Sequence, residues 1–304
     1  MKIAVVGIGG VGGLIGGALA RVLPQTIFIA RGEHLKVIRE EGLTVRSGLL
    51  GEFTVVPALV TDRAEEAGIV DAVILATKGY DLEEACRQIA PMIGEQTLVV
   101  PLLNGVMVSQ LMRPLLPPCV LADGCMSCFS YIERPGVIAH PSTLATLTLG
   151  MAEGEPHPAL IHLTMLLESV GFKASVTKEI RQASWQKYVL MCGVSTAYAW
   201  FDQPAGPIRE DPEKLDFLCR CHQEIIDTAS GHGVALPEDL IDRCMQSFLA
   251  QPPEATSSLY RDLRDGKPRT ELRPVIARMC ELGAEVGVPT PCHQAVVDKY
   301  RDRL

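Results

Sequence analysis

The chain has 304 residues, of which 47% are hydrophobic and 21% charged, and its net charge is −8. This length is sufficient for two domains with separate cores, and the composition is typical of a globular protein. The negative net charge argues against a broad binding surface for nucleic acid or for an anionic membrane. The ten cysteines lie mostly in apolar runs, where a reduced cysteine packs as a small hydrophobic residue, so we expect a reducing, cytoplasmic setting.

The start of the chain is unusually apolar. Residues 3–20 carry no charge, which requires a signal peptide or a membrane span to be considered. Seven of these eighteen residues are glycine, however, and the run begins directly with a strand-like IAVV segment. We therefore expect neither a cleaved leader nor a membrane anchor, and a nucleotide-binding turn explains the glycines better.

Short apolar strands alternate with helical segments over the first 176 residues. Helices are predicted over residues 11–22, 34–41, 81–93 and 157–170, and residues 43–56 have the turn residues of a hairpin. The βαβ order predicts a doubly wound, largely parallel α/β sheet of the Rossmann type. Strands are predicted at residues 2–8, 26–30, 72–76, 98–103, 119–123, 137–140, 146–150 and 171–176.

From residue 178 onward the pattern changes. Apolar residues recur at spacings of three and four, and Pro and Gly mark the loops between the apolar runs. The sequence therefore predicts two domains, a dinucleotide-binding domain at residues 1–176 and an all-helical domain at residues 177–304. We expect about six helices in the second domain, which would close over the substrate and offers a surface for a homodimer.

A glycine-rich turn follows the first predicted strand and opens an uncharged helix. In the G-x-G-x-x-G pattern the first glycine permits a tight turn, the second lets a pyrophosphate approach the backbone, and the third allows close packing of helix on sheet. The N-terminus of the helix offers N–H groups and a positive dipole end to the phosphates. The residues of this turn are Gly7, Ile8, Gly9, Gly10, Val11 and Gly12.

The residue after the second strand indicates which dinucleotide binds. An NAD site usually has Asp or Glu there, which accepts from the ribose 2′-hydroxyl. This chain has Arg31, and the nearest acid, Glu33, lies beyond Gly32. A guanidinium suits a 2′-phosphate through charge-assisted hydrogen bonds, so we predict NADP as the cofactor.

Five segments in chain order resemble the motifs of the ketopantoate reductase (2-dehydropantoate 2-reductase) family, which has V-K, Q-N-G-V, W-x-K and S-S-M-x-x-D…G-R-x-T-E-I at the last four. They are residues 31–35 (RGEHL), 76–78 (ATK), 103–106 (LNGV), 185–187 (WQK) and 257–272 (SSLYRDLRDGKPRTEL). The resemblance implies NADPH-dependent reduction of a 2-oxo acid to a 2-hydroxy acid, the reaction of pantothenate biosynthesis in that family.

The resemblance also implies roles for individual residues. Beyond the glycine-rich turn and Arg31, it places Lys78 near the adenosine ribose phosphate and Glu271 at the nicotinamide ribose. It places Asn104 between nicotinamide and substrate. It makes Lys187 the catalytic acid and Ser258 a substrate ligand. Lys187 suits that role chemically, because hydride addition to a ketone leaves an alkoxide that needs a nearby cation and a proton.

The chain departs from the family on one helix face. Residues 187, 191 and 195 are four apart and share that face. The family has Lys, Asn and Asn there, whereas this chain has Lys187, Met191 and Ser195, and it has Ala205 where the family has a further asparagine. We assign Met191 and Ser195 to the substrate site, and we expect a 2-oxo acid with an apolar or bulkier tail.

Three other interpretations stay open. The missing asparagines are compatible with an NADP-binding regulator without turnover, and other two-domain hydroxy-acid dehydrogenases, of the 6-phosphogluconate or glycerol-3-phosphate type, share the architecture. Metal binding is the third, because Cys125 and Cys128 have the spacing of a zinc knuckle and Cys219, Cys221 and His222 are close together. The Cys-x-Cys spacing suits a tetrahedral site poorly, so we expect no metal.

Overall fold

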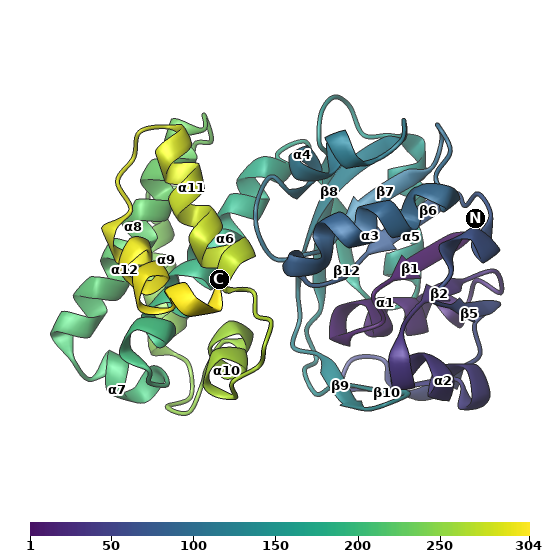
Figure 1. Cartoon of the computed structure of the whole chain (residues 1–304), viewed down its shortest axis with the longest axis horizontal. Coiled ribbons are helices and arrows are strands. Elements are labelled where there is room, and N and C mark those ends of the chain that lie inside the picture. The colour runs from purple at the N-terminus through teal and green to yellow at the C-terminus, as the bar shows by residue number, and fades with distance from the viewer. The chain divides into compact units, whose positions relative to one another are not determined.

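A computed structural model describes residues 1–304 (Figure 1). The chain forms two compact units. Unit 1 comprises Met1–Leu103 and Met107–Ile180, and unit 2 comprises Asn104–Val106 and Arg181–Leu304. The short segment Asn104–Val106 therefore belongs by its contacts to the unit formed by the second half of the chain. No helix of either unit combines the length and the apolar character needed to cross a membrane.

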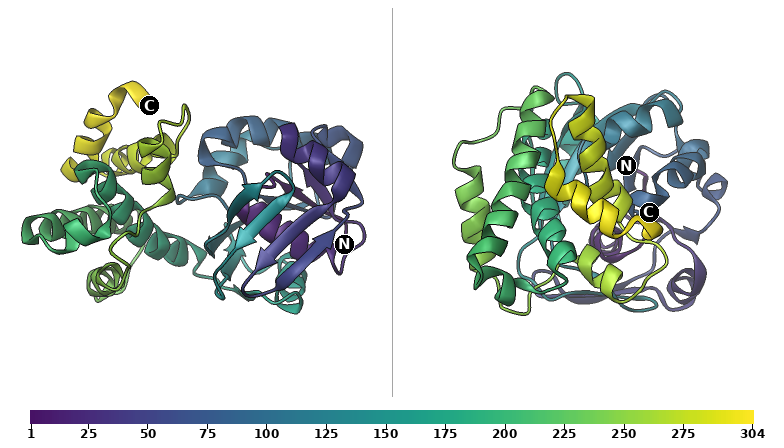
Figure 2. Two further views of the ribbon diagram at one scale, coloured as in Figure 1. Left: turned by 90° about the horizontal axis from the view of Figure 1, so that it is seen from below. Right: turned by 60° about the vertical axis from the view of Figure 1, so that its left-hand side comes forward.

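Unit 1 is built on an eight-stranded sheet, which appears as a row of arrows in Figure 2 (left). Its strands pair in parallel except at the contact of β11 with β8, which is antiparallel. This confirms the predicted Rossmann-type sheet and adds one antiparallel junction. In spatial order the strands are β12 (Lys173–Val176), β11 (Thr146–Met151), β8 (Val120–Ser127), β7 (Leu98–Pro101), β6 (Ala72–Leu75), β1 (Ile3–Val6), β2 (Ile27–Ile29) and β5 (Leu59–Thr61).

Helices cover both faces of this sheet because successive side chains of each buried strand point to opposite sides. Ile3 and Val5 of β1 pack in the core with α1 (Gly10–Ala20) and α5 (Pro158–Ser169), and Ala4 and Val6 pack in a second core with α3 (Leu82–Ile89). Helix α3 is shorter than the helix predicted over residues 81–93, because 3₁₀ turns at Gly79–Asp81 and Ala90–Met92 lie on either side of it. The remaining helices of unit 1 are α2 (Gly32–Glu41), α4 (Val108–Met112) and the 3₁₀ turns Ala64–Ala67 and Arg113–Leu115.

A second sheet of four strands packs on the other side of α1. The predicted hairpin at residues 43–56 is confirmed as two of these strands, but the strand predicted at residues 137–140 pairs with that hairpin and not with the large sheet. Neither β5 nor β9 follows from the sequence pattern, because one has three residues and the other is exposed along its whole length. The strands, in spatial order, are β4 (Gly51–Val55), β3 (Leu43–Ser47), β10 (Val137–His140) and β9 (Tyr131–Arg134).

The glycines of α1 fit this helix between the two sheets. A Cβ added at Gly16 would lie 2.8 Å from the ring of Phe28 in the large sheet. A Cβ added at Gly17 would lie 2.6 Å from Val45 in the small sheet. Close packing on two sides therefore accounts for the uncharged, glycine-rich helix that the sequence places after β1.

Unit 2 is all-helical, with seven α-helices where the sequence predicts about six. Its longest helix is α6, whose residues Val194, Ala197 and Tyr198 enter a core with Phe217, Leu218 and Phe248 from two later helices. The helices are α6 (Ile180–Phe201), α7 (Ala205–Arg209), α8 (Pro212–Gly231), α9 (Leu240–Leu249), α10 (Ser258–Arg264), α11 (Arg278–Glu285) and α12 (Pro291–Lys299). A π-helical segment at Leu272–Ala277 precedes α11, and a 3₁₀ turn at Arg301–Arg303 ends the chain.

Candidate active site

The glycine-rich turn of unit 1 lies against the end of the neighbouring strand β6. Gly7 has φ +85°, a conformation that side chains rarely adopt. A Cβ at Gly7 would lie 2.9 Å from the backbone carbon and oxygen of Ala76 and from the side chain of Thr77. Glycine is therefore required at this position both by backbone conformation and by the close approach of the loop that leads to Lys78.

The N-terminus of α1 has the properties of an anion site. No side chain caps it, and its first turn contains no acidic residue. A Cβ at Gly9 would meet nothing within 4 Å, so the space in front of this turn is open. The first N–H groups of a helix have no intrahelical partner, and a bound pyrophosphate satisfies them. The turn therefore fits the diphosphate of a dinucleotide.

Arg31 follows the last residue of β2 by two positions and directly precedes α2, of which it is the N-cap residue. Its Nη2 atom donates to Asp81 Oδ2 at 2.7 Å, and the side chains of Arg31 and Asp81 are 71% and 7% exposed. The carboxylate thus holds one edge of the guanidinium while most of the arginine side chain stays in solvent. Lys78 is half-buried at the start of the 3₁₀ turn that contains Asp81.

The sequence pattern does not single out Asp81. Fifty residues separate it from Arg31, and it reads as part of an ordinary crossover segment. The strand order offers the one indication, because β2 and β6 both flank β1 and Arg31 and Asp81 each follow one of these two strands.

Lys187 and Asn104, which the resemblance assigns to catalysis, come together within unit 2 with Glu271, which it assigns to the nicotinamide ribose. Lys187 Nζ on α6 donates to Asn104 Oδ1 at 3.2 Å, and Asn104 Nδ2 donates to Glu271 Oε2 at 3.4 Å. Asn104 thus lies between an ammonium and a carboxylate, with its carbonyl oxygen toward the cation and its amide nitrogen toward the anion. Lys187 and Asn104 are half-buried, and Glu271 is buried at 2% exposure. A lysine oriented in this way can donate a proton to an oxygen placed beside it.

The remaining residues of the predicted substrate site differ in accessibility. Met191 lies one turn after Lys187 on α6 and is half-buried, whereas Ser195 is only 1% exposed. Ala205, at 0% exposure, begins α7 inside the core of unit 2. Ser258 is exposed at the first position of α10, and the helix is capped by Ser257, whose hydroxyl accepts from the backbone N–H of Tyr260 at 3.1 Å.

Comparison with known proteins decides the family. Two family models match, ketopantoate reductase PanE/ApbA over residues 3–154 and the C-terminal domain of ketopantoate reductase PanE/ApbA over residues 179–303. The chain belongs to the ketopantoate reductase family. It is accordingly an oxidoreductase of the class that acts on a CH–OH group with a nicotinamide cofactor.

Relatives match this ketopantoate reductase family member over nearly its whole length. The 2-dehydropantoate 2-reductase of Halobacterium salinarum is 26% identical, covering 99% of this chain and 98% of that protein. The crystal structure of 2-dehydropantoate 2-reductase from Porphyromonas gingivalis W83 is 28% identical with a TM-score of 0.82, covering 98% of each chain. D-mandelate dehydrogenase, solved with NADH and anilino(oxo)acetate, shares the fold at a TM-score of 0.88 and 22% identity, covering 100% of this chain and 98% of that chain.

Proposed function

We propose that this protein reduces a 2-oxo acid to the corresponding 2-hydroxy acid with NADPH, as a ketopantoate reductase-like enzyme. The observation that carries the proposal is the contact of Lys187 with Asn104, and of Asn104 with Glu271, in unit 2. A proton donor held by a neutral amide, which is itself oriented by a buried carboxylate, suits carbonyl reduction. A protein that only senses NADP has no need of such an arrangement.

Lys187 and Asn104 act on the oxygen of the reacting carbonyl group. Bound NADPH supplies the hydride that this chemistry requires. As the keto carbon gains the hydride, its oxygen gains negative charge, and the Lys187 ammonium stabilises that charge and donates its proton, so that the product is the neutral hydroxyl. Asn104 Oδ1 accepts a hydrogen bond from one of the three N–H groups of Lys187 Nζ and so orients the ammonium. Glu271 accepts from Asn104 Nδ2 and so fixes the orientation of the Asn104 amide. The lysine amine then recovers a proton from solvent.

Residues of unit 1 suit the dinucleotide. The turn from Gly7 to Gly12 would hold the diphosphate at the uncapped start of α1, and Arg31 would pair with the 2′-phosphate. Lys78 would add a second cation beside the adenosine ribose. These assignments need neither a metal ion nor a covalent intermediate.

The substrate is proposed to have an apolar or bulkier tail. Met191 offers a flexible apolar wall where the family has an amide, and Ser195 offers one small hydroxyl. An apolar wall cannot hydrogen-bond the tail of ketopantoate, so ketopantoate is expected to be a poor or moderate substrate. Ser258 is assigned to the polar end of the substrate.

An NADPH-oxidation assay tests this function directly. Purified protein is screened against ketopantoate, pyruvate, 3-methyl-2-oxobutanoate, 4-methyl-2-oxopentanoate and phenylglyoxylate, with NADH in parallel. We expect turnover with at least one acid and a preference for NADPH. Absence of turnover with every acid, together with tight NADPH binding, would favour a regulator. A cytoplasmic location and a homodimer are part of the proposal, and light scattering at several protein concentrations tests the second.

A further inference from the structure

The residue after Lys187 on α6 is a buried tyrosine. Tyr188 is 1% exposed, and its hydroxyl donates to the backbone oxygen of Val275 at 2.5 Å. Burial, and secondarily the nearby Cys192 thiol, raises the pKa of Tyr188 well above its usual range, so the hydroxyl keeps its proton and remains a donor. Cys192, one turn later on α6, donates from Sγ to the same oxygen at 3.8 Å. Two side chains of α6 thus contact one backbone oxygen of a distant segment.

That segment is the π-helical turn at Leu272–Ala277, which begins directly after Glu271. Turns of this kind are rare and occur frequently at functional sites. The backbone N–H of Val275 donates to the backbone oxygen of Glu271 at 3.0 Å. Val275 is therefore bonded through its N–H to Glu271 and through its oxygen to Tyr188, so that one residue links the tyrosine hydroxyl to the residue that carries the buried carboxylate.

The contacts around Lys187 form a closed ring. Lys187 Nζ donates to Asn104 Oδ1, and Asn104 Nδ2 donates to Glu271 Oε2. From Glu271 the ring continues through the backbone of Val275 to the hydroxyl of Tyr188, which is the neighbour of Lys187 in the chain. All five residues belong to unit 2. The hydrogen bond of Tyr188 closes this ring and ties α6 to the segment that follows the carboxylate.

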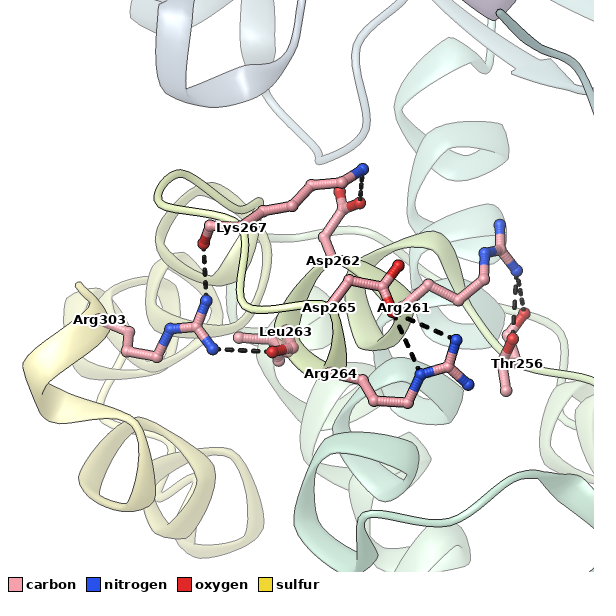
Figure 3. A network of polar contacts seen from close by, with 8 residues as sticks. All are labelled: Thr256, Arg261, Asp262, Leu263, Arg264, Asp265, Lys267 and Arg303. Atoms are coloured by element: carbon pink, nitrogen blue, oxygen red, sulfur yellow. Dashed lines mark hydrogen bonds and ion pairs between the residues drawn. The ribbon is translucent and has the colours of Figure 1, made fainter. Parts of the chain in front are cut away.

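The loop on the other side of Glu271 is fastened to a different part of unit 2. Arg303 donates to the backbone oxygens of Leu263 at 2.8 Å and of Lys267 at 2.7 Å, which ties the end of the chain to α10 and to the loop after it (Figure 3). Glu271 is thus held from both directions along the chain. The contact of Tyr188 is the one of these that reaches the helix of the proton donor.

We propose that Tyr188 is a positioning residue for this reaction, which through Val275 holds Glu271 at the place where Asn104 can orient Lys187. The inference rests on the proposed function, because it gives Tyr188 a part in the proton donation by Lys187. A displacement of about 1 Å can cost about 10²-fold in rate even when its cause lies far from the reacting atoms. A buried hydrogen bond that fixes the donor therefore influences kcat, although the tyrosine itself is closed off from the substrate.

Removing the hydroxyl tests the proposal. Tyr188→Phe keeps the aromatic ring, which packs edge to face with Trp185 at 5.8 Å between ring centroids. With the best acid of the panel, kcat should fall by about tenfold, whereas KM and the dissociation constant of NADPH should change less than twofold. Tyr188→Met also lacks the hydroxyl and fills the space with a flexible apolar side chain. It should show a similar fall in kcat, so the test does not depend on one variant folding.

Tyr198 provides a matched control on the same helix. It is also 1% exposed, and its hydroxyl donates to Gln251 Oε1 at 2.8 Å, away from the segment that follows Glu271. Each Tyr→Phe change removes one buried hydrogen bond, so both should lower Tm by about 2–4 °C. Tyr198→Phe should leave kcat within about twofold of the wild type. Equal losses of kcat in the two variants would overturn the proposal, because the loss would then follow the stability of α6.

Combination with Lys187→Ala separates positioning from general damage. If Tyr188 acts through Lys187, adding Tyr188→Phe to Lys187→Ala should lower kcat by less than about twofold more, because the donor that it positions is already gone. A further tenfold fall in that background would overturn the proposal, as would single variants of Tyr188 whose kcat stays within about twofold of the wild type. A wild type that reduces no acid of the panel would instead overturn the proposed function.

Discussion

Replacing Arg31 by alanine tests the cofactor assignment most directly. The matched probes are adenosine 2′,5′-bisphosphate and 5′-AMP, which differ only in the 2′-phosphate and require neither substrate nor turnover. Calorimetric titration of wild type and Arg31→Ala gives the share of binding free energy that the arginine contributes to that phosphate. Thermal unfolding of the variant serves as the control for its fold.

The structure sets the expected size of the effect. Hydrogen bonds to a charged group contribute about 1.5–3 kcal/mol. Arg31 is 71% exposed, which weakens its interactions through solvent screening, and Asp81 already accepts from Nη2 at 2.7 Å. We therefore expect a loss at the lower end, about 1.5 kcal/mol, which is about tenfold in Kd for the bisphosphate. Binding of 5′-AMP should change less than twofold.

Replacing Asp81 should change the affinity for the bisphosphate in the opposite direction from replacing Arg31. A carboxylate and a phosphate on opposite edges of one guanidinium lie about 7 Å apart, and their repulsion costs about 1 kcal/mol when solvent and salt screen it. Asp81→Asn keeps an oxygen that accepts from Arg31 and removes the charge, so it should strengthen bisphosphate binding about fivefold. Equal losses of both probes in Arg31→Ala would refute the assignment of Arg31 to the 2′-phosphate, and unchanged bisphosphate binding in Asp81→Asn would refute the role of the carboxylate.

Three other outcomes are expected. Lys187→Ala should lower kcat by about 10²–10⁴ with NADPH affinity retained, and a fall in kcat of less than tenfold would place the acid elsewhere. The double variant Met191→Asn, Ser195→Asn should raise kcat/KM for ketopantoate relative to kcat/KM for the other 2-oxo acids. A wild type whose kcat/KM is already highest with ketopantoate would contradict this prediction. Burial, and secondarily the nearby His293, lowers the pKa of His222 to about 4, so below pH 6.5 the unfolded chain binds a proton that the folded chain excludes. Unfolding free energy from urea titrations should therefore fall by about 3 kcal/mol as the pH drops from 6.5 to 4. Both ring nitrogens of His222 lack a hydrogen-bond partner, so His222→Leu should flatten this slope, and an unchanged slope would assign it to other groups.

The sequence predicts those parts of the fold that depend on local pattern. The glycine-rich turn, the two buried strands on either side of β1 and the helical second half each follow from residues within one short window. The small sheet does not, because β3 pairs with β10 in parallel across about ninety residues and a strand pattern does not name its partner. The junction of β8 with β11 is unpredictable for the same reason.

The candidate site divides in a similar way. Asn104 is separated in sequence from Lys187 by 83 residues and from Glu271 by 167 residues. Only the resemblance to the family predicts that the three residues belong to one site. Composition and spacing alone leave each as an ordinary polar residue. Contacts such as Arg31 with Asp81, or Tyr188 with Val275, depend on side-chain direction, which a sequence pattern does not contain.

Burial separates the two altered positions on α6. Met191 is half-buried, so a change there alters a partly exposed surface, which we propose faces the substrate. Ser195 is 1% exposed, and an asparagine there must fit a larger side chain into a packed interior, at a typical cost of about 1–3 kcal/mol in stability. Any shift toward ketopantoate in the double variant should therefore arise mainly from position 191, and the loss of stability mainly from position 195. In the proposed substrate site, the methionine at position 191 is therefore the difference from the family that a substrate tail would meet, and the buried serine at position 195 is not.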